Sequence, residues 1–257
     1  MEKCSFAWPK PVDGISEAQL ININLKVRPG SLVGVVGFLA SGKSSLLAAI
    51  LGDMHLIEGD VTCTGRVAFC PQLPVVHNMT IRDNILYGKP MDAPFYHRVI
   101  RCCQLVHDIN KLEAGDLTEV GEKGTNLSGG QKQRISIARA VYSQSDVYLL
   151  DDSLSALDPV VASCVFKEVI GNNGLLQHKG VLEFYIDMPD IWFIQLDSHF
   201  RINKVPGDGL RSWLPLPPSF PDFYECLRAA ILAYYATSSS RSQQFLSIST
   251  VASFRVL

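Results

Sequence analysis

Two adjacent carboxylates follow an apolar run in the stretch VYLLDDSLSALDPVV, residues 147–161. The run predicts a buried strand over 146–152 that ends at Asp151 and Asp152. Two acids at such a position repel each other and lose hydration, so keeping both ionised costs free energy. A bound divalent cation would relieve that repulsion. The pair therefore predicts a site for a cation, with acid–base chemistry beside it.

A second stretch, GFLASGKSS, fits the spacing G-x-x-x-x-G-K-[ST] with Gly37, Gly42, Lys43 and Ser44. It follows an apolar run and opens a helix predicted over 43–52, which is the context this phosphate-binding motif requires. The glycines let backbone N–H groups point at phosphate oxygens, and the helix N-terminus adds a favourable dipole. Lys43 is expected to reach the β- and γ-phosphates of a nucleotide, and Ser44 to offer its hydroxyl to Mg²⁺. We assign four further loop residues to the same nucleotide site: Phe38, Ala40, Ser41 and Ser45.

The acidic pair is expected to serve the same nucleotide. The strand that ends at Asp151 should run parallel to the strand before the phosphate loop, at the sheet edge where open α/β sheets bind ligands. Asp151 can hold Mg²⁺ there beside Ser44, directly or through water. Asp152 can orient the attacking water as a general base, and the alternative is that it is a solvated turn acid.

Periodicity predicts the elements that position these groups. Residues 20–27 alternate as a half-buried strand, with Ile21, Ile23, Leu25 and Val27 on its buried side. A short strand is predicted over 66–72, and the pattern from about 79 to 142 is helical. Asp158 and Pro159 are typical of an N-cap and first turn, and predict a helix to about residue 170.

Composition excludes several classes of function. The 257 residues are 47% hydrophobic and 19% charged, so a sizeable core is expected. The net charge of −2 gives no electrostatic argument for nucleic acid or for an anionic membrane surface. No stretch predicts a membrane span, and the start MEKCSFAW predicts no secretory signal. Seven cysteines without a C-x-x-C pair indicate buried thiols in a reducing compartment.

The stretch NLSGGQKQRISIARA, residues 126–140, decides between kinds of phosphate-loop protein. Ser128 with the amides of Gly129 and Gly130, at a predicted helix start, makes a second anion site. Together with Leu127 and Gln131 these residues resemble the signature sequence of ABC-type ATPases. The resemblance implies that this site closes over the γ-phosphate bound to a partner domain.

Other segments resemble further motifs of that family. Gln72 in AFCPQ resembles the Q-loop glutamine, which touches Mg²⁺ and signals to the membrane domain. Ser155 to Asp158 resemble the D-loop. Trp8 resembles the aromatic residue that stacks on adenine, and the alternative is a core tryptophan on an early strand.

Residues of about 4–179 are similar to the first nucleotide-binding domain of subfamily C, the multidrug resistance-associated proteins. PGSLVGVVG, TIRDNILYG and LSGGQKQRISIARAVY carry this resemblance. It implies an α/β P-loop NTPase core with a small antiparallel β subdomain near the N-terminus and a helical subdomain from about 79 to 140. It also implies ATP and Mg²⁺ as cofactors, and a second nucleotide-binding domain and transmembrane domains as partners outside this chain. The expected location is the cytoplasmic face of a membrane, or the cytoplasm if the chain stands alone.

The sequence departs from the family pattern at three places. Phe38 is unusual in the phosphate loop, where its position contributes mainly backbone. Asp152 stands where most ABC ATPases have a catalytic glutamate, and one methylene less withdraws the carboxylate by about 1.5 Å. First domains of subfamily C often carry this aspartate and hydrolyse slowly or not at all.

The third departure is the C-terminal segment. The family's switch histidine should end one more strand in the 180s, yet residues 180–190 contain no histidine, while His178 comes too early and His199 too late. We therefore expect an ABC-type ATP-binding domain over 1–179, truncated before that strand. Residues 180–257 are expected to be a non-homologous, irregular and loosely packed tail.

Three functions remain open on the sequence. The first is an ATP-binding and hydrolysing domain of an exporter, in which nucleotide-driven dimerisation powers transport. The second is a regulatory or hydrolysis-deficient module that binds ATP, favoured by Asp152 and the missing histidine. The third is a chromosome-maintenance or DNA-repair ATPase. It is disfavoured because the residues between the phosphate loop and the signature contain neither sustained heptads nor a basic patch.

Overall fold

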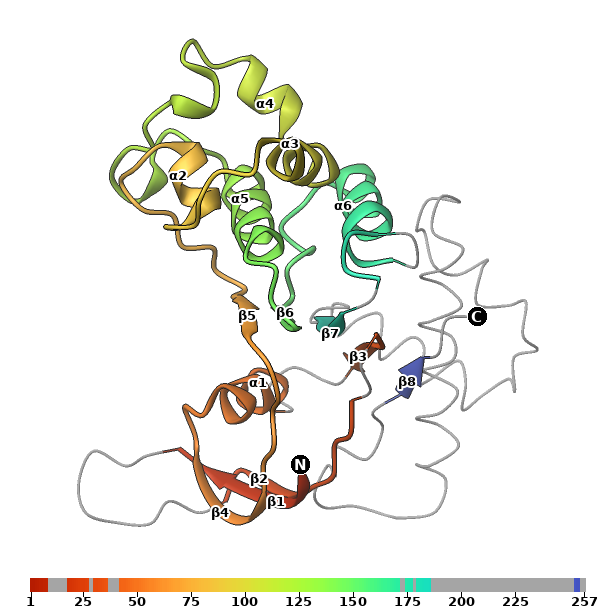
Figure 1. Cartoon of the computed structure of the whole chain (residues 1–257). Helices are drawn as coiled ribbons and strands as arrows, with labels where there is room; N and C mark the ends of the chain where they lie inside the picture. The colour runs from red at the N-terminus through yellow and green to blue at the C-terminus, as the bar shows by residue number, and fades with distance from the viewer. Residues whose placement is uncertain are drawn as a thin grey trace, which may run out of the picture. The chain divides into compact units, whose positions relative to one another are not determined.

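The computed structural model describes residues 1–8, 18–27, 30–36, 42–171, 174–177, 179–185 and 252–254 (Figure 1). They divide into two compact units, which are described separately. The first unit is built around Met1–Val27 and Gly34–Thr64, and the second around Gly65–Glu183. The mixed α/β fold predicted from the sequence is confirmed.

A three-stranded antiparallel sheet forms the base of the first unit. Its strands are β1 (Glu2–Ala7), β2 (Leu20–Ile23) and β4 (His55–Asp60), in the order β2-β1-β4. Cys4 and Phe6 of β1 are buried, as are Leu20 and Ile23 of β2. The predicted antiparallel β part near the N-terminus is therefore confirmed.

The predicted alternation over 20–27 is wrong at Ile21. Ile21 is 54% exposed, whereas Leu20 and Ile23 are both 3% exposed. Asn22, between them, has a φ of +55°, and the register of β2 against β1 shifts at this point. A left-handed residue interrupts the two-residue side-chain period, so Leu20 rather than Ile21 faces the core.

Helix α1 (Lys43–Leu51) follows β3 (Leu32–Val36) in the chain. Leu46 and Leu47 are buried. The helix ends at Gly52, whose φ of +88° suits glycine, and the Asp53 N–H donates to the Ala48 carbonyl at 2.8 Å. The predicted helix after the phosphate loop is thus confirmed, including its glycine stop.

Parallel strands lie at the centre of the second unit. β5 (Val67–Cys70) pairs in parallel with β6 (Val147–Asp151), and β7 (Gly180–Tyr185) is the next strand in the sheet. The Val181 N–H donates to the Ser31 carbonyl at 3.0 Å, just before β3. Burial raises the pKa of Tyr148 on β6 to about 12, in keeping with a strand covered on both faces.

β7 lies in the segment that was expected to be irregular. It begins at Gly180 and includes the buried Val181. A strand therefore occupies the place where the family pattern requires one, although no histidine follows it in residues 186–190. Those residues, His178 and His199 lie outside the described part, as does most of the predicted tail. The last described strand is β8 (Ala252–Phe254).

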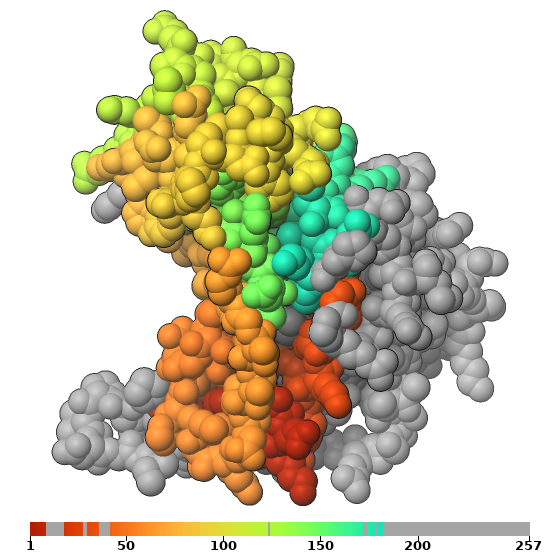
Figure 2. All heavy atoms as spheres, viewed as in Figure 1, coloured from red at the N-terminus to blue at the C-terminus, as the bar shows by residue number. Residues whose placement is uncertain are grey.

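The helical arm follows β5, and each of its longer helices begins at a polar cap. The side chains of Thr80, Asp92 and Ser128 accept hydrogen bonds from the first turns of α2, α3 and α5. In Figure 2 the yellow and yellow-green atoms of this arm lie together on the visible face. The elements of the arm are α2 (Ile81–Leu86), α3 (Ala93–Cys102), α4 (Val106–Asn110), η1 (Gly115–Leu117), η2 (Glu122–Gly124) and α5 (Gly129–Tyr142).

After β6 the chain forms α6 (Pro159–Val165), which continues as a π-helical turn, η3 (Phe166–Ile170). This confirms the helix predicted to end near residue 170.

The cysteines that the structure describes are free thiols, and burial raises the pKa of Cys102 and of Cys103. Within the described residues, no helix is long and apolar enough to cross a membrane.

One buried amide connects the start of the arm to α5. The Asn84 side chain donates to the carbonyls of His77 at 2.9 Å, Met79 at 3.3 Å and Thr80 at 3.1 Å. Its oxygen accepts from the His77 N–H at 2.9 Å and from Arg139 Nη2 at 2.9 Å. Asn84 is fully buried. If its side chain were removed, no water could take over its hydrogen bonds to these carbonyls and N–H groups.

We predict that Asn84→Ala lowers the free energy of unfolding by about 2–4 kcal/mol, because several buried polar groups lose their partner. The control is Asn126→Ala. Asn126 is an exposed residue of the same arm that binds the Gly121 N–H and the Glu119 carbonyl. Its loss should cost no more than about 1 kcal/mol. Urea unfolding measures both, and equal losses would contradict the role given to Asn84.

Candidate functional site

The first unit holds the end of the phosphate loop. Gly42 is the N-cap of α1 with a φ of +88°, a conformation that glycine adopts without strain. Lys43 is only 5% exposed, Ser44 is exposed and Ser45 is half-buried. The loop thus turns into the helix at the predicted glycine. The remaining predicted loop residues lie outside the described part: Gly37, Phe38, Ala40 and Ser41.

Trp8 directly follows β1 in the first unit. Its side chain is 41% exposed, and its backbone N–H donates to Gln19 Oε1 at 3.0 Å. The alternative of a core tryptophan is therefore wrong. An exposed indole leaves a face for a ligand, and stacking on adenine stays a prediction.

The acidic pair lies in the second unit and is buried. Asp151, the last residue of β6, is 8% exposed, and Asp152 is 6% exposed. The alternative of a solvated turn acid at 152 is therefore wrong. Asp152 has a φ of +50°, uncommon for a residue with a side chain. Backbone strain of this kind concentrates at functional sites, where the surrounding structure maintains it.

The Asp152 carboxylate joins two loops. Its Oδ2 accepts from Gln72 Nε2 at 3.2 Å and from the Ser155 hydroxyl at 2.8 Å. The same hydroxyl lies 3.0 Å from the Asp152 carbonyl. Gln72 follows β5 and Ser155 belongs to the segment that resembles the D-loop, so the Asp152 carboxylate is held between the two.

The pairing of β5 with β6 explains this contact. Cys70 lies opposite Leu150 in the parallel register. Gln72 and Asp152 each come two residues later, so the same register brings them face to face at the carboxyl ends of the strands. The sequence predicted both residues for one site, and the structure brings them together.

The signature segment is a capped helix start. The Ser128 hydroxyl accepts from the Gln131 N–H at 3.2 Å, and the Ser128 N–H donates to Gln131 Oε1 at 2.8 Å. This is a complete capping box, and it fixes the first turn of α5. An N-terminal turn held in this way presents backbone N–H groups and a favourable dipole to an anion.

The fold itself does not demand the two signature glycines. A Cβ added at Gly129 would meet nothing within 4 Å, and one at Gly130 would meet the Ala156 carbonyl at 3.5 Å and Leu157 Cδ2 at 3.8 Å, which are ordinary contacts. Neither residue has a positive φ. Because glycine weakens a helix, these two residues lower its stability without a need that the described contacts explain.

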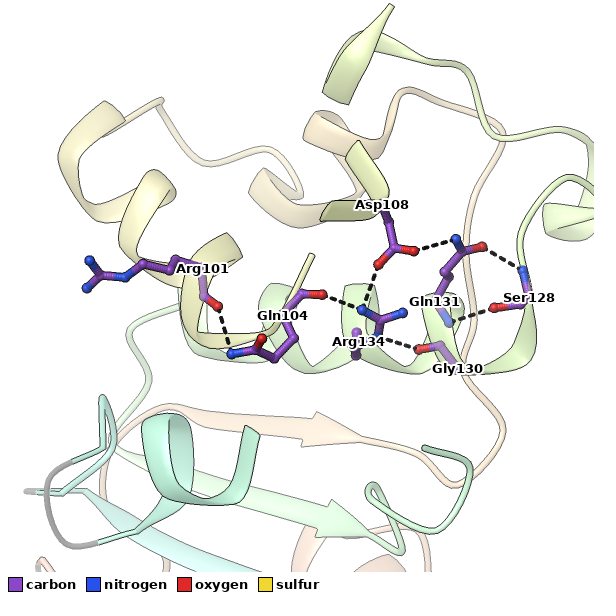
Figure 3. A network of polar contacts seen from close by, with 7 residues as sticks. All are labelled: Arg101, Gln104, Asp108, Ser128, Gly130, Gln131 and Arg134. Carbon is purple, nitrogen blue, oxygen red and sulfur yellow. Dashed lines mark hydrogen bonds and ion pairs between the residues drawn. The ribbon is translucent and has the colours of Figure 1, made fainter. Parts of the chain in front are cut away.

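Asp158 and the ion pair of Asp108 with Arg134 differ in how far the sequence predicts them. Asp158 was predicted, and its Oδ1 accepts from the Val160 N–H at 3.0 Å as the N-cap of α6. Asp108 and Arg134 were missed, although they form an ion pair that also contacts Gln131 (Figure 3). They are 26 residues apart, and no local spacing marks such a pair.

The polar residues of the second unit fit a magnesium ion that is bound mainly through phosphate. Asp151 and Gln72 carry the hard oxygen atoms that Mg²⁺ prefers, and such sites use one or two carboxylates plus substrate phosphates. Among the described residues, no cluster of three or more His, Cys, Asp or Glu side chains could hold a metal by itself.

Comparison with known proteins agrees with this geometry. The ABC transporter family matches residues 20–155. The chain belongs to the ABC transporter family. It is 48% identical over 177 residues to ATP-binding cassette sub-family C member 2 of Mus musculus, covering 69% of this chain and 11% of that protein. It is 51% identical over 179 residues to multidrug resistance protein mrp-7 of Caenorhabditis elegans, covering 70% of this chain and 12% of that protein.

The chain therefore spans about a tenth of the length of these ABC transporters. A third relative, ATP-binding cassette sub-family C member 3 of Rattus norvegicus, is 46% identical over 175 residues, which are 68% of this chain and 11% of that protein. The resemblance to the multidrug resistance-associated proteins is thus confirmed for the ATP-binding domain.

We predict that Gly129→Ala and Gly130→Ala each leave the fold intact. Each should raise the free energy of unfolding, by less than about 1 kcal/mol. Gly124→Ala is the control. Gly124 has a φ of +71°, and its Cβ would lie 2.6 Å from Val76 Cγ2. It should destabilise by more than about 1 kcal/mol. Thermal unfolding compares all three, and a large loss at Gly129 would mean that the fold itself needs this glycine.

Proposed function

We propose that this chain binds Mg-ATP and acts as the nucleotide-binding domain of an exporter of the multidrug resistance-associated kind. The observation that supports this most directly is the buried Asp152 carboxylate between Gln72 and Ser155. Two loops from the carboxyl ends of parallel strands converge there on one acid, as a ligand site of an open α/β sheet requires.

Each residue has a defined part in this proposal. Lys43 contacts the β- and γ-phosphates, and Ser44 offers a hydroxyl to the metal. Asp151 and Gln72 supply further oxygen atoms to Mg²⁺, which when bound neutralises charge on the phosphates. Trp8 stacks on adenine. The loop backbone supplies the remaining phosphate contacts through Gly37, Phe38, Ala40, Ser41, Gly42 and Ser45.

The signature acts on a second nucleotide. Ser128, Gly129 and Gly130 would contact the γ-phosphate of ATP held by a partner domain, with Gln131 keeping the helix start in shape. Two nucleotide-binding domains would then close head to tail and drive transmembrane domains outside this chain. The chain would act at the cytoplasmic face of a membrane.

A second candidate function is binding of ATP without turnover. The observation in its favour is that Asp152 Oδ2 already accepts two hydrogen bonds, from Gln72 and Ser155. The shorter aspartate also places its carboxylate about 1.5 Å behind that of a glutamate. A base held in this way is poorly placed to take a proton from water, since misplacement of about 1 Å can cost on the order of 10²-fold in rate.

We predict that Mg-ATP at 100 times its Kd stabilises the chain by about 2.7 kcal/mol. Lys43→Ala should abolish the rise in melting temperature, because the side chain that reaches the phosphates is lost. Lys26→Ala is the control, since Lys26 is an exposed lysine of the first unit and should leave the shift unchanged. A shift that survives Lys43→Ala would contradict the assigned phosphate loop.

We further predict that phosphate release is slow and that Asp152→Glu raises it by about tenfold or more, because the added methylene advances the carboxylate. The assay uses the chain alone and mixed with the second nucleotide-binding domain of a relative. Asp152→Asn is the control: it should remove residual turnover and keep the ATP-induced thermal shift. If the native chain and both variants bind ATP but release phosphate at the same rate, the binding-only function is supported.

A further inference from the structure

An aspartate outside the signature accepts hydrogen bonds from two side chains of α5 at once (Figure 3). Asp108 lies on α4, and its Oδ1 accepts from Gln131 Nε2 at 2.9 Å. Its Oδ2 accepts from Arg134 Nη1 at 2.7 Å. The Asp108 side chain is 22% exposed and that of Arg134 is 12% exposed, so water screens this pair only in part.

One branch of this network leads to the helix cap. A carboxylate only accepts hydrogen bonds, so Asp108 fixes the Gln131 amide with its nitrogen toward Oδ1. The amide oxygen then faces the Ser128 N–H, which donates to it at 2.8 Å. Reversal of the amide would lose both bonds together. Asp108 therefore sets the orientation on which the capping box depends.

The other branch leads to the signature backbone. Arg134 Nε donates to the Gly130 carbonyl at 3.2 Å, and Arg134 Nη1 also donates to the Gln104 carbonyl. Gln104 has a φ of +55° and lies between α3 and α4. The guanidinium is thus directed at Asp108 and two carbonyls, and its planar fork links α4 to the first turn of α5.

We propose that Asp108 is a positioning residue for the signature: through Gln131 and Arg134 it holds the first turn of α5 in the shape that binds an anion. This rests on the proposed function, in which Ser128, Gly129 and Gly130 bind a γ-phosphate. Asp108 touches no phosphate itself. It contributes a fixed charge that orients two side chains, so that the helix N–H groups need no rearrangement when the anion arrives.

The test uses the full chain and two variants of Asp108. Asp108→Ala removes both branches, and amide exchange at Ser128 should accelerate by about tenfold. Asp108→Asn keeps an oxygen that can accept from Gln131 but loses the ion pair. It should restore Ser128 exchange to within about twofold of the native rate, while the Gly130 amide resonance shifts as it does in Asp108→Ala.

The matched control is Asp116→Ala. Asp116 forms an ion pair with Arg82 at 2.8 Å in the same unit, with side chains 16% and 36% exposed. Its loss removes a comparable ion pair and should leave Ser128 exchange at the native rate. If both alanine variants accelerate Ser128 equally, or if Asp108→Ala leaves it unchanged, the positioning role is overturned.

Titration with inorganic phosphate separates this inference from the proposed function. In the native chain phosphate should shift the amide resonances of Gly129 and Gly130, and Asp108→Ala should weaken that response severalfold. An absence of any response in the native chain would overturn the anion site. Ser128 exchange without phosphate would still decide whether Asp108 positions the helix start.

Discussion

The in-register pairing of β5 with β6 is the constraint on which the described site depends. Two parallel strands that match Cys70 with Leu150 deliver Gln72 and Asp152 to the same point beyond their ends. Because side chains alternate along a strand, a slip by one residue would turn one of these groups to the opposite face. Tyr148, Leu149 and Leu150 are all buried in this register, so both faces of β6 are covered.

Burial makes the acidic site both costly and well defined. Asp151 and Asp152 are almost fully removed from water, so their charges need partners that the loops supply. Gln72 and Ser155 meet part of that need at Asp152. The same contacts that make the acid tolerable also reduce its freedom to act as a base.

The first turn of α5 is held in a similar way, by the side chains around it. Ser128 and Gln131 satisfy each other across the first turn of α5, and Asp108 fixes Gln131 from outside. The glycines at 129 and 130 add no side chain over the N–H groups. Hydrogen-bonded side chains thus surround an uncovered stretch of backbone, the arrangement that the proposed anion site would need.

Local patterns predicted much of this molecule. The spacing of Gly42, Lys43 and Ser44, the apolar run before Asp151 and the Ser128 signature each lie within one short segment, where side-chain period and cap chemistry suffice. The sequence also predicted the cap at Asp158 and the glycine stop at Gly52. It failed at Ile21, because a single positive φ at Asn22 reverses an alternation that the letters alone do not reveal.

Only the tertiary structure decided which distant residues meet. The contacts of Asp152 with Gln72 and of Asp108 with Arg134 join residues 80 and 26 positions apart. Strand register and the fold of the helical arm create these contacts, and neither leaves a periodic trace in the chain. The sequence by itself determined the family, because each of the family's motifs lies within one short segment. The tertiary structure decided that Asp152 is buried and held, because burial is a property of everything packed around a residue.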